Sequence, residues 1–155
     1  MSEVVFYEKP GCITNARQKQ LLAAHGHRLV VRDLLSEPWT RERLRDFFGS
    51  RPVPDWFNRS APRVRDGDLA IDSLDGEQAL RLMLADPLLI RRPLLETTAG
   101  RCAGFEPGPI FDHLGIRLTD GSSIDRCSRP SSADDCTLGA DEPAFPNGCR
   151  REARR

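Results

Sequence analysis

Residues 3–15 read Glu-Val-Val-Phe-Tyr-Glu-Lys-Pro-Gly-Cys-Ile-Thr-Asn, and this stretch decides the fold. β-Branched and aromatic residues fill positions 3–7, which predicts a buried strand. A Lys-Pro-Gly loop signal follows the strand. Over residues 13–25 the apolar positions have helical spacing, and Gly26 is a typical residue to end a helix. The stretch therefore predicts a strand, a short loop and a helix, with Cys12 at the start of the helix.

The same signals predict the remaining elements of the chain. They are a strand at 28–33, a helix N-capped by Thr40 and ending near Phe48, a short helix within 53–59, a helix capped by Ser73 or Asp75 and ending near Leu84, a short helix or turn at 86–90, strands at 94–97 and 101–105, and a helix at 109–114. A βαβ unit makes its two strands parallel, and a hairpin adds an antiparallel pair. The order predicts an α/β, thioredoxin-like fold with a mixed four-stranded sheet and a helical insertion.

The C-terminal part of the chain has a different composition. Residues 119–155 are rich in Ser, Asp, Gly, Pro and Arg and contain few large apolar side chains. Such a segment buries too little apolar surface to offset its conformational entropy. We therefore expect one domain over residues 1–117 and a disordered tail over residues 118–155.

The composition argues against several classes of protein. Lys plus Arg and Asp plus Glu both number 23, so the basic excess of a nucleic-acid-binding protein is missing. No apolar run approaches the 20 or so residues that a membrane helix needs. The N-terminus lacks the features of a signal peptide. These observations predict a cytoplasmic protein with reduced thiols and without a nucleic-acid or membrane partner.

The five cysteines do not resemble a disulfide framework, because their number is odd and their spacings are wide. A zinc site built from the three C-terminal cysteines is an alternative, but the paired ligand spacing of zinc sites is missing. No metal site is therefore expected. The cysteines are Cys12, Cys102, Cys127, Cys136 and Cys149.

Cys12 is the candidate reactive group. The N–H groups and partial positive charge at a helix N-terminus favour a thiolate. Thr14 and Asn15, in the first helical turn, are candidate donors to the sulfur or to a bound anion. The alternative is a small cysteine packed in the core. We expect Cys102 to be a buried strand residue and Arg91 to be solvated.

Three separate motifs carry a family resemblance. Phe-Tyr-Glu-Lys-Pro-Gly-Cys12 with the following Ile-Thr-Asn resembles the nucleophile loop of the arsenate reductase (ArsC/Spx) family. Asp86-Pro-Leu-Leu-Ile-Arg-Arg-Pro93 resembles the second signature of that family, and Trp56-Phe-Asn-Arg59 falls where the family often has another arginine. The resemblance covers residues 3–116. It is closest to the nitrogenase-associated subgroup, which has a similar Asp-Leu-Leu-Ser-Glu-Pro-Trp segment.

The resemblance implies roles for individual residues. Cys12 matches the nucleophile that attacks arsenate, and Arg59 and Arg92 match arginines that hold the oxyanion. Pro93 matches the cis-proline that faces the cysteine. A third family arginine would fall near Phe105, and Arg101 is the candidate to replace it.

The fourth position of the CxxC switch found in Spx-type regulators is Asn15 in this chain. A resolving thiol would therefore come from glutathione, a glutaredoxin or the tail. No resident cofactor is implied.

Two functions remain open at this point. The first is an accessory protein of nitrogen fixation with one redox-capable thiol, whose partner is nitrogenase or another nitrogen-fixation protein. The second is an arsenate-type oxyanion reductase linked to glutathione or glutaredoxin. The loop cysteine and the Arg-Pro signature favour the reductase. The missing third arginine and second cysteine favour the accessory protein, for which the same thiol would serve docking or sensing.

Overall fold

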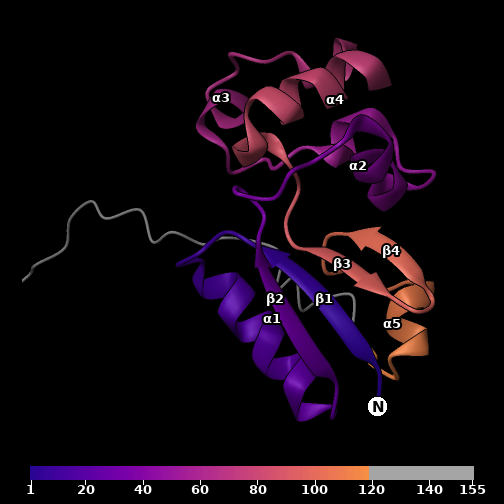
Figure 1. Ribbon diagram of the computed structural model, residues 1–155. Helices are drawn as coiled ribbons and strands as arrows, with labels where there is room; N and C mark the ends of the chain where they lie inside the picture. The colour runs from indigo at the N-terminus through magenta and orange to yellow at the C-terminus, as the bar shows by residue number, and fades with distance from the viewer. Residues whose placement is uncertain (119–155) are drawn as a thin grey trace, which may run out of the picture.

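The computed structural model describes residues 1–118 (Figure 1). The predictions for the tail after residue 118 and for a zinc site in it lie outside the described residues. Among the described residues, no helix has both the length and the apolar character that crossing a membrane requires.

A parallel βαβ unit opens the fold. Strand β1 (Glu3–Glu8) is followed by helix α1 (Ile13–Ala24) and strand β2 (Arg28–Asp33). The two strands pair in parallel along their whole length, from Glu3 opposite Arg28 to Glu8 opposite Asp33. The β-branched run and the Pro-Gly loop therefore produce the strand, turn and helix that the sequence predicts.

A hairpin completes the sheet. Strand β3 (Leu94–Thr97) pairs antiparallel with β1 and with β4 (Gly100–Ala103), and the strand order is β2-β1-β3-β4. Helix α5 (Pro109–His113) follows. The mixed four-stranded sheet and the thioredoxin-like arrangement are thereby confirmed.

The helical insertion lies between β2 and β3. In Figure 1 its helices gather beyond one end of the sheet, whereas α1 and α5 lie against the strands. Side chains cap its two longer helices: Thr40 Oγ1 accepts from the Arg43 N–H, and Asp75 forms a capping box with Gln78. Its elements are α2 (Arg41–Phe48), the 3₁₀ helix η1 (Val53–Trp56), α3 (Pro62–Arg65), η2 (Ile71–Ser73), α4 (Gly76–Ala85) and η3 (Pro87–Leu89).

Two hydrophobic clusters lie on opposite faces of the sheet, because alternate residues of a strand point to opposite sides. Phe6 of β1 packs in the cluster that contains α1 and α5. Tyr7, the next residue, packs in the cluster that contains α2 and α4. The carboxyl end of β1 is therefore fixed from both sides, and the loop that carries Cys12 begins at that end.

Tyr7 also connects the insertion to the sheet through its hydroxyl group. Arg43 of α2 donates Nη2–H to this oxygen at 2.6 Å, and the hydroxyl donates to Glu96 Oε2 of β3 at 3.3 Å. Glu37 accepts from Arg43 Nη1 at 2.7 Å. Burial raises the pKa of the Tyr7 hydroxyl above its ordinary value, while the positive charge of Arg43 opposes that shift. The neutral hydroxyl thus belongs to the contact that holds α2 on the sheet.

Candidate functional site

A tight turn places Cys12 at the N-terminus of α1. The Cys12 N–H donates to the Lys9 carbonyl at 3.2 Å, which closes the turn. Gly11 has φ of +79°, a left-handed conformation that glycine adopts without steric cost. The Cys12 carbonyl accepts from the Ala16 N–H at 3.1 Å, and Cys12 is the N-cap residue of α1. Cys12 as a residue is partly buried.

The segment before β3 lies at the same end of the sheet. Leu94, the first residue of β3, pairs with Tyr7 near the end of β1. Because the two strands are antiparallel, the residues before Leu94 and those after Tyr7 leave the sheet at the same end of the strands (Figure 1). The Arg92–Pro93 peptide bond is cis, as the family resemblance implies. The Pro93 carbonyl accepts from the Gly104 N–H at 2.8 Å, which ties this turn to the end of β4.

Arg92 carries an unfilled hydrogen-bond donor. Its Nη1 atom is buried, and no acceptor among residues 1–118 reaches it. A buried donor without an acceptor costs free energy, and a guanidinium N–H group is suited to donate a hydrogen bond to an anionic ligand. Among the predicted oxyanion-binding residues, Arg92 is therefore the one whose hydrogen bonding in the described residues best supports this role.

Asn15, one of the two predicted donors in the first turn of α1, is buried. Only 2% of Asn15 is exposed, and its Nδ2 donates to Gln18 Oε1 at 2.9 Å. The Asn15 Oδ1 atom is buried and has no partner among the described residues. The Nδ2 group thus already has one acceptor, and the role of Asn15 as a donor to the sulfur or to an anion stays a prediction. Thr14, one residue earlier, is only partly buried and stays a candidate donor.

Comparison with known proteins assigns the chain to a family. The model of the ArsC family matches residues 7–111, which include the thiol loop and the Arg92–Pro93 turn. The chain belongs to the ArsC family.

Three proteins illustrate what this chain is similar to. An uncharacterized 15.7 kDa protein in the draG 3′ region of Rhodospirillum rubrum is 42% identical over 143 residues, which are 92% of this chain and 98% of that protein. An ArsC-family-related protein from Bacteroides fragilis superposes with a TM-score of 0.62 at 23% identity, covering 72% of this chain and 98% of the other. An arsenate reductase from Vibrio cholerae gives 0.59 at 22% identity, covering 75% and 98%. The two structures establish the shared fold.

Two positions depart from the arginine pattern expected of an ArsC oxyanion site. Phe105, near which the third arginine would fall, is buried against Phe111 of α5 in an edge-to-face contact with ring centroids 4.7 Å apart. Arg101, the candidate replacement, donates instead to Asp46 and Glu96, each at 2.9 Å. Phe105 carries no charge, and the Arg101 guanidinium is paired with two carboxylates.

Arg59 lies on the insertion and faces solvent. Its side chain is 67% exposed, and Nη2 lies 3.5 Å from Asp55 Oδ1. The neighbouring Asn58 N–H donates to the Leu89 carbonyl, so this segment runs alongside the residues that precede Arg92. Phe57 and Ile90 form an antiparallel bridge. Arg59 follows Phe57 and Arg92 follows Ile90, so the two arginines lie on opposite sides of this bridge along the strand direction. The prediction that Arg59 and Arg92 together hold an oxyanion stays a prediction.

Sequence reasoning missed a cluster of charged residues beside the Arg92–Pro93 turn. Arg91 was expected to be solvated, but its side chain is only 17% exposed and its Nη2 donates to Glu106 Oε1. The other carboxylate oxygen of Glu106 accepts from Arg51 Nη1 at 2.9 Å. The expectation for Arg91 was wrong because nothing in the local sequence indicates that Glu106 and Arg51 fold against it.

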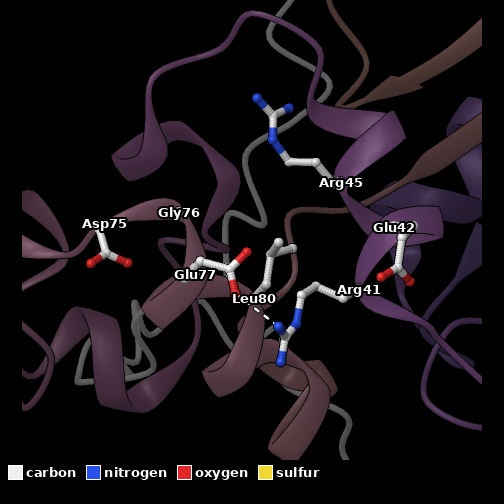
Figure 2. A pocket seen from close by; sticks show the side chains of 7 residues that line it. All are labelled: Arg41, Glu42, Arg45, Asp75, Gly76, Glu77 and Leu80. Carbon is white, nitrogen blue, oxygen red and sulfur yellow. Dashed lines mark hydrogen bonds and ion pairs between the residues drawn. The ribbon is translucent and has the colours of Figure 1, made fainter.

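The insertion also has a surface hollow of about 410 Å³ between α2 and the start of α4 (Figure 2). Arg41 and Glu77 form a 2.9 Å ion pair within it. None of the predicted site residues lines this hollow, so it is separate from the thiol loop. Its lining residues are Arg41, Glu42, Arg45, Asp75, Gly76, Glu77 and Leu80.

Proposed function

We propose that this ArsC-family protein is an accessory protein of nitrogen fixation that works in the cytoplasm through one redox-capable thiol, Cys12. The observation that carries the proposal is the 42% identity to the Rhodospirillum rubrum protein across nearly the whole of that relative. The name of that relative places it in the draG 3′ region, a gene context associated with nitrogenase. The proposed partner is nitrogenase or another protein of nitrogen fixation.

The position of Cys12 supports thiol–disulfide exchange as its chemistry. In the first step the Cys12 thiolate attacks one sulfur of a disulfide, forms a mixed disulfide and releases the other sulfur as a thiolate. Next, a glutathione thiolate attacks the Cys12 sulfur of the mixed disulfide, releases the partner thiolate and leaves Cys12 bound to glutathione. A thiolate from a second glutathione or from a glutaredoxin then attacks the glutathione sulfur, forms a disulfide with it and releases the Cys12 thiolate. Cys12 is the N-cap residue of α1, and the partial positive charge at a helix N-terminus favours the thiolate that attacks in such an exchange.

Gene replacement tests both parts of the proposal. The gene of the Rhodospirillum rubrum relative is deleted, and this chain is supplied as the wild type, as Cys12→Ser or as the matched control Cys102→Ser. Nitrogenase activity is measured by acetylene reduction under nitrogen-fixing conditions. We expect the deletion to lower the activity, and the wild type and Cys102→Ser to restore it, while Cys12→Ser does not. Full restoration by Cys12→Ser would reject the thiol, and normal activity of the deletion strain would reject the link to nitrogen fixation.

The buried Arg92 Nη1 atom favours a second candidate function, an oxyanion reductase of the arsenate type with glutathione or glutaredoxin as the reductant. Cys12 would attack the oxyanion while Arg92 holds it. Arsenate turnover measured with glutathione and a glutaredoxin tests this candidate. Turnover that is lost in both Cys12→Ser and Arg92→Gln would support it. Absence of turnover in the wild type would leave only the accessory function.

A further inference from the structure

The carboxylate of Glu106 bridges two arginines from different parts of the chain. Arg51 follows α2 and contacts Oε2, while Arg91 precedes the cis-proline turn and contacts Oε1. One oxygen therefore faces each guanidinium group. Two arginines that converge on one oxyanion are also how proteins bind phosphate and related ligands.

The two arginines are anchored independently of Glu106, and Trp56 connects them. The indole Nε1–H of Trp56 donates to the Arg51 carbonyl at 2.8 Å, and the Trp56 carbonyl accepts from the Arg91 N–H at 2.9 Å. Trp56 is buried and stacks on Phe48, with the ring planes 5° apart. The backbone positions of both arginines are consequently fixed by the core of the insertion.

Gly104 makes room for the guanidinium group of Arg91. A Cβ atom at position 104 would lie 2.6 Å from Arg91 Nε, so the guanidinium group would have to shift to admit a side chain there. Gly104 also has φ of +86°, which favours glycine. Arg91 Nη1 donates in addition to the Asp55 carbonyl at 3.3 Å. Residues 55–56 and 104–106 thus surround the Arg91 side chain and backbone.

Glu106 is the most exposed member of the cluster. Its side chain is 39% exposed, compared with 30% for Arg51 and 17% for Arg91. It lies on a loop directly after buried Phe105 and before Pro107. The carboxylate is therefore the partner that can leave while the two arginines remain in position.

We infer that Arg51 and Arg91 form a binding site for a tetrahedral oxyanion of the phosphate class, and that the carboxylate of Glu106 occupies and closes this site. Glu106 acts as a built-in competitor that keeps such anions away from the arginine pair. Arg91 directly precedes the Arg92–Pro93 turn, which lies at the same end of the strands as the thiol loop. An anion that displaces Glu106 therefore binds beside this turn. The binding does not depend on Cys12 or on the function proposed above.

Phosphate binding to the full chain tests the inference. Isothermal titration with inorganic phosphate compares the wild type, Glu106→Gln and the matched control Glu96→Gln, which removes another carboxylate paired with an arginine. We expect Glu106→Gln to bind phosphate on the order of 10- to 100-fold more tightly than the wild type, because two charge-assisted donors are released. Glu96→Gln should bind like the wild type. The gain should disappear when Arg51→Gln is added to Glu106→Gln.

Several results would overturn the inference. These are a phosphate affinity of folded Glu106→Gln within about twofold of the wild type, an equal gain in Glu96→Gln, or a gain that survives Arg51→Gln. Circular dichroism checks that each variant is folded. If Glu106→Gln does not fold, Glu106→Asp keeps the charge while shortening the side chain, and it should bind phosphate more tightly than the wild type. An unchanged affinity in that variant would equally reject the site. Because phosphate does not react with a thiol, either failure leaves the proposal for Cys12 untouched.

Discussion

Replacing Asn15 with cysteine tests how the first turn of α1 is built. Cys12 is the N-cap residue, and Asn15 occupies the third helical position, whose side chain can reach back to the N-cap. Asn15 is buried, whereas its neighbour Ala16 is exposed. The thiol introduced by Asn15→Cys should therefore lie next to Cys12 and form an internal disulfide under oxidising conditions. Ala16→Cys is the matched control, because it introduces a thiol one residue later that faces solvent.

The structure also sets the expected change in stability of the reduced variant. Removing the buried Asn15 Oδ1 eliminates an unsatisfied acceptor that costs about 1–3 kcal/mol. The change also removes the 2.9 Å bond to Gln18, which contributes about 0.5–1.5 kcal/mol. The two effects oppose each other. Reduced Asn15→Cys should therefore have a free energy of unfolding between about 0.5 kcal/mol below and about 2.5 kcal/mol above that of the wild type.

The assay uses chains in which the four cysteines other than Cys12 are replaced by serine. Urea unfolding with a reductant gives the free energy of unfolding, and alkylation followed by mass spectrometry after treatment with oxidised glutathione counts the remaining thiols. A reduced Asn15→Cys that loses more than about 3 kcal/mol would show that the amide makes contacts beyond those described. An internal disulfide in Ala16→Cys but not in Asn15→Cys would refute the placement of the two side chains.

Two further predictions concern the surroundings of the site. Because burial raises the pKa of Tyr7, its neutral hydroxyl stabilises the fold fully below about pH 10, and this contribution is lost as the pH rises through the higher folded-state value. Urea unfolding at about pH 8 and pH 10.5 should show a smaller alkaline loss in Tyr7→Phe than in the wild type, and equal losses would contradict the assignment. Gly104→Ala should lower the free energy of unfolding by about 1–3 kcal/mol through its positive φ alone, and by more through its contact with Arg91. Gly67→Ala has a similar φ and an open surrounding, so an equal loss in both variants would mean that Arg91 does not press on Gly104.

Local sequence signals predicted the sheet well. The strands at 28–33 and 94–97 begin and end where expected, because β-branched and apolar runs are bounded by clear turn residues. The helix cap at Thr40 was predicted for a similar reason, and Asp75 was one of two candidates, with Ser73, for the cap of α4. α3 was missed as a separate helix because its four residues are too short for a periodic pattern.

The contacts around the site were predicted less well. Asn15 was predicted only as a candidate donor to the sulfur or to an anion, and its burial was not predicted. Its spacing from Gln18 and Leu22, three and seven positions later, places it on the buried face and could have revealed this. The bridge from Arg51 to Arg91 through Glu106 depends on three segments that only the tertiary fold brings together. No local pattern in the sequence encodes such a contact.

The most direct test of the central claim is the reaction of the full chain with oxidised glutathione, followed by peptide mapping with mass spectrometry. The account predicts that Cys12 forms a mixed disulfide with glutathione rapidly in the folded protein, while Cys102, on β4, reacts much more slowly. The Cys12 adduct should be removed by a glutaredoxin with reduced glutathione. A Cys12 that stays unmodified, or that reacts no faster than Cys102, would contradict the claim that this ArsC-family chain works through a thiol at the N-terminus of α1.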